Sequence, residues 1–233
     1  ERNTELVDLC HMREARSELR FAKMQCAGTD YIVIDNRSGA LVYPESLCVR
    51  LCRPHYGVGA DGIALIERSD AADAKMTMFN SDGSEGRMAG NCIRCVAKYL
   101  YDNGVVQSDS LTIETASGVK ALKVYTRNGR VSSVSVDMGV PDLRTASLPC
   151  TLPVERAVRY PARIGGRLYN ITCMSLGNPH CVVFCSRVDG VDVARIGPQF
   201  EHAPYFPDRI NTEFIRVVNP NTIKMRVWER GSG

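Results

Sequence analysis

The stretch that decides the fold covers residues 79–100 and reads FNSDGSEGRMAGNCIRCVAKYL. Alternating apolar residues at 75–79 predict a strand that leads into it. Residues 80–86 are typical of a tight turn. From Asn91 onward apolar residues recur at helical spacing, with Asn91 as the expected N-cap and Gly104 as the expected C-terminal stop. A turn that opens directly into an apolar helix presents free backbone N–H groups, which suit a carboxylate.

Similar patterns predict the remaining secondary structure. We expect a helix opened by Pro44, because proline is tolerated in a first turn, and a hairpin at Asn128-Gly129. A second helix is expected over residues 193–202. The predicted strands cover residues 21–25, 31–35, 41–43, 63–67, 111–116, 120–126, 130–137, 168–174, 181–184, 212–218 and 222–229.

Composition narrows the class of function. The chain has 233 residues and a net charge of +3, without long runs of one sign, so neither nucleic acid nor membrane is an expected partner. Ten cysteines without a secretory signal indicate a reducing compartment, with the cytoplasm as the default and most thiols buried. The string Gly57-x-Gly59-x-x-Gly62 follows a helix and precedes a strand, which is the reverse of the order in a nucleotide-binding fold.

Several short motifs occur in a fixed order along the chain. FNSDGSE at 79–85 is followed by Met88, Gly90-Asn91 and IRC at 93–95. Around it stand KM at 23–24 with GTDY at 28–31, GVGADG at 57–62, GNPH at 177–180 and ERGSG at 229–233. Together these motifs resemble the diaminopimelate epimerase family of cofactor-independent amino-acid epimerases, over about residues 20–233.

The resemblance implies a fold. It is an α+β fold of two pseudo-symmetric domains, each a mostly antiparallel sheet or barrel wrapped around a central helix. We expect an N-terminal extension over 1–20, a first half over 21–140 and a second half over 141–233. The extension is interpreted as a solvated helix rather than a docking segment. The second half is expected to be incomplete, because residue 233 precedes its central helix.

The resemblance also implies a mechanism without cofactor or metal. Inversion of an α-carbon needs one group to remove a proton and another to deliver one to the opposite face, and thiols at helix N-termini suit both tasks. The family uses two cysteines, one from each half. His180 and Glu229 resemble the residues that tune these thiols. The implied substrate-binding positions are Thr29, Gly62, Asn80, Gly90, Asn91, Asn178, Asn211, Glu229 and Arg230.

This sequence departs from the family at the chemistry itself. Ala89 stands where the family has its first catalytic cysteine, and Cys92 follows three residues later, either in the cleft or, as we prefer, in the core. The second catalytic cysteine is expected beyond Gly233. Thr29 replaces an asparagine, and Gly62 stands where some members have glutamine. Cys92 and Cys95 have the spacing of half a zinc site. Because the sequence offers no well-matched second pair of ligands, we do not expect a metal.

The leading interpretation is epimerisation of L,L-diaminopimelate to the meso form, for lysine and peptidoglycan synthesis, with this chain weakly active or inactive. Two alternatives remain open. One is a racemase for another amino acid such as histidine, and the other is a catalytically dead homologue that binds an amino acid. A homodimer or a complementing C-terminal segment is the expected partner, by resemblance to the family.

Overall fold

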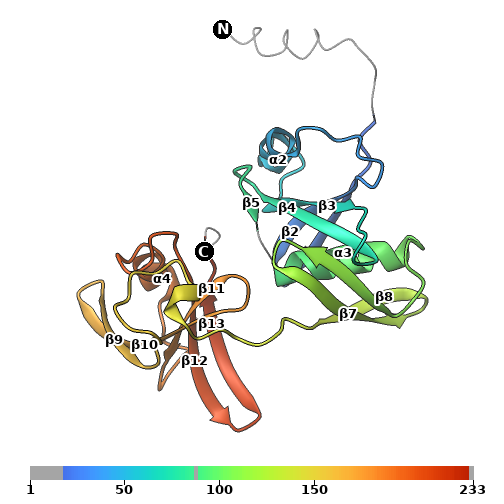
Figure 1. Cartoon of the computed structure of the whole chain (residues 1–233). Helices are drawn as coiled ribbons and strands as arrows, with labels where there is room; N and C mark the ends of the chain where they lie inside the picture. The colour runs from blue at the N-terminus through green and yellow to red at the C-terminus, as the bar shows by residue number, and fades with distance from the viewer. Residues whose placement is uncertain (1–17, 87–88, 231–233) are drawn as a thin grey trace, which may run out of the picture.

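The structure is a computed structural model that describes residues 18–86 and 89–230. Within this part of the chain two β-sheets follow one another, one in the first half and one in the second (Figure 1). The sheets are joined by the segment 137–159, which includes a short 3₁₀-helix, η1 (Thr145–Ser147). The domain boundary that we place at residue 140 stays a prediction, and the helix expected in the N-terminal extension falls largely outside the described residues.

The first sheet has the strand order β1-β2-β3-β4-β6-β7-β8, with the short β5 paired to β4. The pairs β2/β3 and β4/β6 are parallel and the others are antiparallel. Its strands are β1 (Ala22–Cys26), β2 (Thr29–Asp35), β3 (Gly62–Glu67), β4 (Ala74–Asn80), β5 (Glu85–Gly86), β6 (Ser110–Thr115), β7 (Gly118–Arg127) and β8 (Arg130–Val136). The mostly antiparallel sheet that the resemblance implied is therefore confirmed.

Helix α3 (Gly90–Asp102) lies in the curl of this sheet and contacts both of its edge strands, β1 and β8 (Figure 1). Its apolar positions are fully or almost fully buried, among them Ile93, Val96 and Leu100. Helix α2 (Pro44–Cys52) packs on the other face of the sheet, against Ile63 and Phe79 among others. The organising stretch thus forms the central helix that the sequence predicted.

Of the two predicted ends of α3, the C-terminal one is confirmed and the N-terminal one is wrong. Gly104 has a φ of +69° and donates its N–H to Tyr101 O, so the glycine stop is confirmed. The N-cap, however, is Ala89 and not Asn91, because the first helical hydrogen bond runs from Ile93 N–H to Ala89 O. The Asn91 side chain bonds to other side chains and leaves the capping position to an alanine. The strand predicted at residues 41–43 is wrong, since this segment is irregular.

The second sheet has the strand order β13-β12-β11-β10-β9, with β11 and β12 parallel. Helix α4 (Val193–Glu201), capped by the Asp192 side chain, lies against the face that carries Val183 and Phe214. The opposite face exposes Phe184 and Met225 among other apolar side chains. The strands are β9 (Tyr160–Ile164), β10 (Arg167–Ser175), β11 (Pro179–Phe184), β12 (Asn211–Asn219) and β13 (Thr222–Trp228).

The helices were also compared with the length and hydropathy of a membrane-spanning segment. None of those in the described part of the chain is both long enough and apolar enough to cross a lipid bilayer.

Candidate active site

Two cavities contain residues from both halves of the chain. The first, which we call the central cavity, has a volume of about 250 Å³ and is lined by the start of α3 and by β11, β12 and the end of β13. The second, the outer cavity, has a volume of about 510 Å³ and includes Asn80, Asn178 and Arg230. Asn178 lines both. Most of the predicted site residues are therefore gathered at these two cavities.

The first half contributes the N-terminal turn of α3. Ala89, Gly90 and Asn91 line the central cavity. The N–H groups of Gly90, Asn91 and Cys92 precede the first helical hydrogen bond, so the helix does not use them. Unused N–H groups at the positive end of a helix dipole favour an anion. This turn is suited to the α-carboxylate of an amino acid.

Strands β11 and β12 of the second half contribute a histidine held from both sides. His180 Nδ1 lies 2.7 Å from Glu213 Oε1, and His180 Nε2 lies 2.7 Å from Asn178 Oδ1. The side chains of His180 and Glu213 are 21% and 13% exposed. The imidazole is thus fixed at the wall of the central cavity.

Asn211 organises the backbone of the second half. Its amide nitrogen donates to Pro179 O at 2.9 Å, and its side-chain oxygen accepts from the N–H of Arg230 at 3.0 Å. This clasp fixes the segment that carries Glu229, whose side chain lines the central cavity. Glu229 accepts no hydrogen bond from the described residues, so its carboxylate is available to an ammonium group.

Neither cavity contains a thiol among the described residues. Cys92 is 0% exposed in the core of the first half, and burial raises the pKa of its thiol well above the usual value. The core placement that we preferred for Cys92 is therefore confirmed. At the position where the family resemblance implied a catalytic thiol, the cavity is lined by Ala89, whose side chain cannot carry a proton.

Comparison with known sequences identifies the family. The sequence model described as diaminopimelate epimerase matches residues 21–143 and 172–233. The diaminopimelate epimerase of Desulfovibrio desulfuricans is 45% identical over 221 residues, which are 92% of this chain and 77% of that protein. Those of Acetivibrio thermocellus and Pelotomaculum thermopropionicum are 43% and 46% identical, over 92% of this chain and 77% and 78% of the relatives. The chain belongs to the diaminopimelate epimerase family. It is therefore an isomerase of the epimerase and racemase type.

Solved structures confirm the fold of this family member. A probable proline racemase from Agrobacterium radiobacter K84, crystallised with carbonate, superposes with a TM-score of 0.60 at 16% identity. The superposition covers 90% of this chain and 70% of the racemase chain. A hydroxyproline epimerase from Agrobacterium vitis gives a TM-score of 0.58 at 14% identity, over 90% and 69% of the two chains. At this identity the likeness concerns the fold alone.

Two of the substrate-binding positions that the family resemblance implied line neither cavity. Thr29 lies behind Asn91 and accepts a hydrogen bond of 3.1 Å from its amide nitrogen. Gly62 is buried and pairs with Asn80 across β3 and β4. A Cβ at Gly62 would lie 2.4 Å from Phe79 O, so this glycine has a packing reason to be there. Direct contact with a ligand remains untested for both.

Two ionisable residues of the central cavity, Tyr31 and Glu213, were not among the predicted site residues of this epimerase family member. Tyr31 is 5% exposed, and burial, followed by its neighbours Cys92 and Glu229, raises the pKa of its hydroxyl far above the usual value. Tyr31 thus offers a neutral hydroxyl. Glu213 lies on β12 two residues after Asn211, and the alternation of a strand puts both side chains on the same face. That alternation was the available signal.

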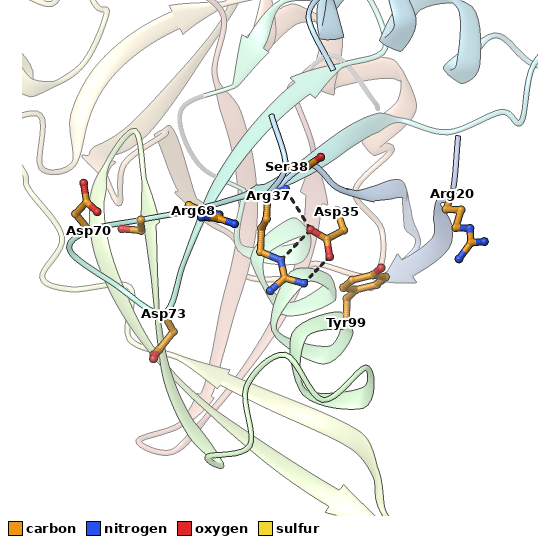
Figure 2. A pocket seen from close by; sticks show the side chains of 9 residues that line it. Arg20, Asp35, Arg37, Ser38, Arg68, Asp70, Asp73 and Tyr99 are labelled. Carbon is orange, nitrogen blue, oxygen red and sulfur yellow. Dashed lines mark hydrogen bonds and ion pairs between the residues drawn. The ribbon is translucent and has the colours of Figure 1, made fainter. Parts of the chain in front are cut away.

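A larger cavity lies elsewhere, on the surface of the first half (Figure 2). It measures about 890 Å³ and contains none of the predicted site residues. Its arginines and aspartates partly satisfy one another, since Arg37 donates to both oxygens of Asp35 at 2.9 and 2.7 Å. These hydrogen bonds hold the pKa of Asp35 below its usual value. Size alone therefore does not locate the site.

Proposed function

We propose that the central cavity binds the α-amino-acid end of diaminopimelate, and that the family reaction at this site is the epimerisation of L,L- to meso-diaminopimelate. The observation that carries the proposal is the meeting of three groups at one cavity. The start of α3 suits a carboxylate, the unpaired Glu229 suits an ammonium group, and the Asn91 and Asn178 amides provide further hydrogen bonds. The names of the relatives supply the substrate.

Epimerisation requires proton removal from the α-carbon on one face and proton delivery on the other. In this chain Ala89 occupies the position of one thiol, and the core position of Cys92 keeps its sulfur away from the cavity. We therefore expect binding of the substrate with weak or no turnover. This absence of a cavity thiol also favours the second candidate function, a homologue that binds an amino acid without converting it.

Exchange of the α-proton in D₂O, followed by NMR, tests the proposal. The protein is offered L,L-diaminopimelate, L-histidine and other amino acids in turn, and binding is measured on the same samples. We expect diaminopimelate to bind best and to exchange slowly or not at all. Preferential binding and exchange of histidine would select the racemase alternative. No binding of any amino acid would overturn the proposal.

A matched pair of variants localises the effect. Glu229→Gln keeps the shape of the side chain but removes the charge offered to the ammonium group, so affinity is expected to fall about tenfold or more. Glu155→Gln makes the same chemical change at an exposed position of the second half and is expected to leave affinity unchanged. Equal affinity of both variants would place the ligand elsewhere.

The remaining expectations belong to the same proposal. A role in lysine and peptidoglycan synthesis and a cytoplasmic location follow from the family function. The homodimer and the complementing C-terminal segment are proposals of the same kind. Sedimentation with and without the ligand tests the first of these, and addition of a relative's C-terminal segment tests the second.

A further inference from the structure

We propose that Glu213 is a positioning residue that fixes the tautomer of His180, so that Nε2 is the ring nitrogen presented for hydrogen bonding and proton exchange at the central cavity. This inference rests on the proposed function for its role in the reaction. The hydrogen-bond pattern on which it depends belongs to the chain itself.

The sheet brings the two residues together. Strands β11 and β12 are parallel neighbours, with His180 opposite Asn211 and Val182 opposite Glu213. His180 and Glu213 therefore lie diagonally across the pair, within reach of long side chains. Alternation puts both on the face away from α4, while the intervening Cys181 is 0% exposed in the core.

The chemistry of the contact decides which nitrogen carries the proton. A carboxylate can only accept a hydrogen bond, so the 2.7 Å contact with Glu213 Oε1 requires a proton on His180 Nδ1. The other nitrogen, Nε2, lies 2.7 Å from Asn178 Oδ1, which can only accept, so an unprotonated Nε2 requires the Asn178 amide to turn its nitrogen toward the ring. An amide side chain offers an acceptor in one orientation and a donor in the other. Nε2 can therefore gain or lose a proton without losing its partner, whereas Nδ1 cannot.

The rest of the carboxylate makes no competing contact. Glu213 Oε2 is buried and has no hydrogen-bond partner among the described residues. Tyr31 and Glu229 are the other ionisable groups that line the cavity, and neither shares a hydrogen bond with His180. The hydrogen bonding of the Glu213 side chain to the described chain is thus directed at one ring nitrogen. A carboxylate that binds one ring nitrogen in this way fixes the tautomer and the orientation of the imidazole. The hydrogen-bond partners of histidines in metal and catalytic sites act in the same way.

Nitrogen chemical shifts of the histidine rings provide a test that does not depend on activity. Long-range ¹H–¹⁵N spectra of the whole chain are recorded at a pH where the rings are neutral, and His180→Asn assigns one of the four histidines. We expect His180 to show a protonated Nδ1 and an unprotonated Nε2. Glu213→Gln, whose amide can accept or donate, is expected to give a mixture of tautomers, while Glu155→Gln leaves the signals unchanged.

Binding of L,L-diaminopimelate by the same variants tests the positioning role. We expect Glu213→Gln to lower affinity about threefold to tenfold, with a melting temperature close to that of Glu155→Gln. An Nε2-protonated or freely exchanging ring in the unaltered chain would overturn the inference. So would a changed tautomer with unchanged affinity. The expected ring signals in a chain that binds no amino acid would instead overturn the proposed function and leave the tautomer assignment standing.

Discussion

Arg94 follows Asn91 by one turn of α3 and donates a hydrogen bond of 2.5 Å from Nη2 to the Asn91 side-chain oxygen. The amide nitrogen of Asn91 donates in turn to Thr29 Oγ1 at 3.1 Å. Asn91 is thus held at both ends before any ligand arrives. The same guanidinium donates from Nε to the sulfur of Cys26 at 3.1 Å, which fixes Arg94 itself.

Replacement of Arg94 tests this arrangement. Arg94→Met keeps much of the side-chain length but removes the charged donor, so Asn91 loses one of its two anchors. We expect the affinity for diaminopimelate to fall about threefold to tenfold, measured by calorimetry. Arg127→Met, at an exposed position of the first half, is the control. Equal affinities would show that Asn91 does not depend on Arg94.

Position 89 decides whether the site can move a proton. In Ala89→Cys the new thiol stands at the N-cap of α3, where the unused N–H groups of the first turn stabilise a thiolate. We expect α-proton exchange of L,L-diaminopimelate in D₂O to rise about tenfold or more over the unaltered chain. No rise in exchange in a folded Ala89→Cys protein that still binds the ligand would count against a catalytic thiol at this position.

Cys92 is expected to matter for stability and not for the ligand. Its side chain is 0% exposed, so Cys92→Ser places a hydroxyl in an apolar core at a cost of about 1–3 kcal/mol. Cys92→Ala leaves a small void without a buried polar group and is the companion variant. Urea unfolding measures both. Loss of α-proton exchange in both Cys92→Ser and Cys92→Ala, in proteins that stay folded, would reassign this sulfur to the chemistry.

Two glycines of the second half form a matched pair. A Cβ at Gly197 in α4 would lie 2.3 Å from the Trp228 ring, whose Nε1 donates to Glu201 Oε2 at 2.7 Å. Gly197→Ala is therefore expected to destabilise the protein by about 1–3 kcal/mol despite the better helix propensity of alanine. A Cβ at Gly190 meets nothing within 4 Å, so Gly190→Ala is expected to be nearly neutral. Thermal melting distinguishes them.

Asp102 makes the stability of the first half depend on acid. Burial alone raises the pKa of its carboxyl, but hydrogen bonds from Lys98 Nζ at 2.7 Å and Val131 N–H at 2.8 Å outweigh burial and lower it. A lowered folded-state pKa stabilises the fold above the unfolded value of about 4, and this contribution is lost as the pH falls through the folded value.

Melting curves between neutral pH and pH 2 check this prediction. Asp102→Asn is expected to cost about 1.5–3 kcal/mol at neutral pH, and the difference from the unaltered chain should shrink in acid. A difference that stays constant over this range would show that the carboxylate charge contributes nothing.

Hydrophobic periodicity predicted most of the elements, including α3 and the Asn128-Gly129 hairpin, because each is long or has distinctive turn chemistry. Asn128 and Gly129 both have positive φ, at 54° and 74°, as the turn requires. β9 was missed because Pro161 argues against a strand, although Tyr160, Ala162 and Ile164 alternate along it. It is an edge strand, and an edge position tolerates proline.

The candidate site was predictable where a motif carried it and not where packing decided. Asn178, His180 and Glu229 come together as the motifs implied. The prediction of Asn91 as N-cap was wrong, because the Asn91 side chain forms hydrogen bonds with Thr29 and Arg94 instead. No local sequence pattern reveals these two side-chain contacts. Glu213 could have been found from strand alternation beside Asn211. The burial of Gly62 could not have been found from the sequence, since it depends on the approach of Phe79 O from a neighbouring strand.

The clasp made by Asn211 has a consequence for the entropy of binding. Because one amide holds both Pro179 O and the N–H of Arg230, the β11 and C-terminal segments are already fixed relative to each other. The entropy cost of ordering these segments falls on folding, so it does not reduce the free energy of binding a ligand at Glu229. These two segments therefore contribute their part of the cavity in an arrangement that is set before the ligand binds.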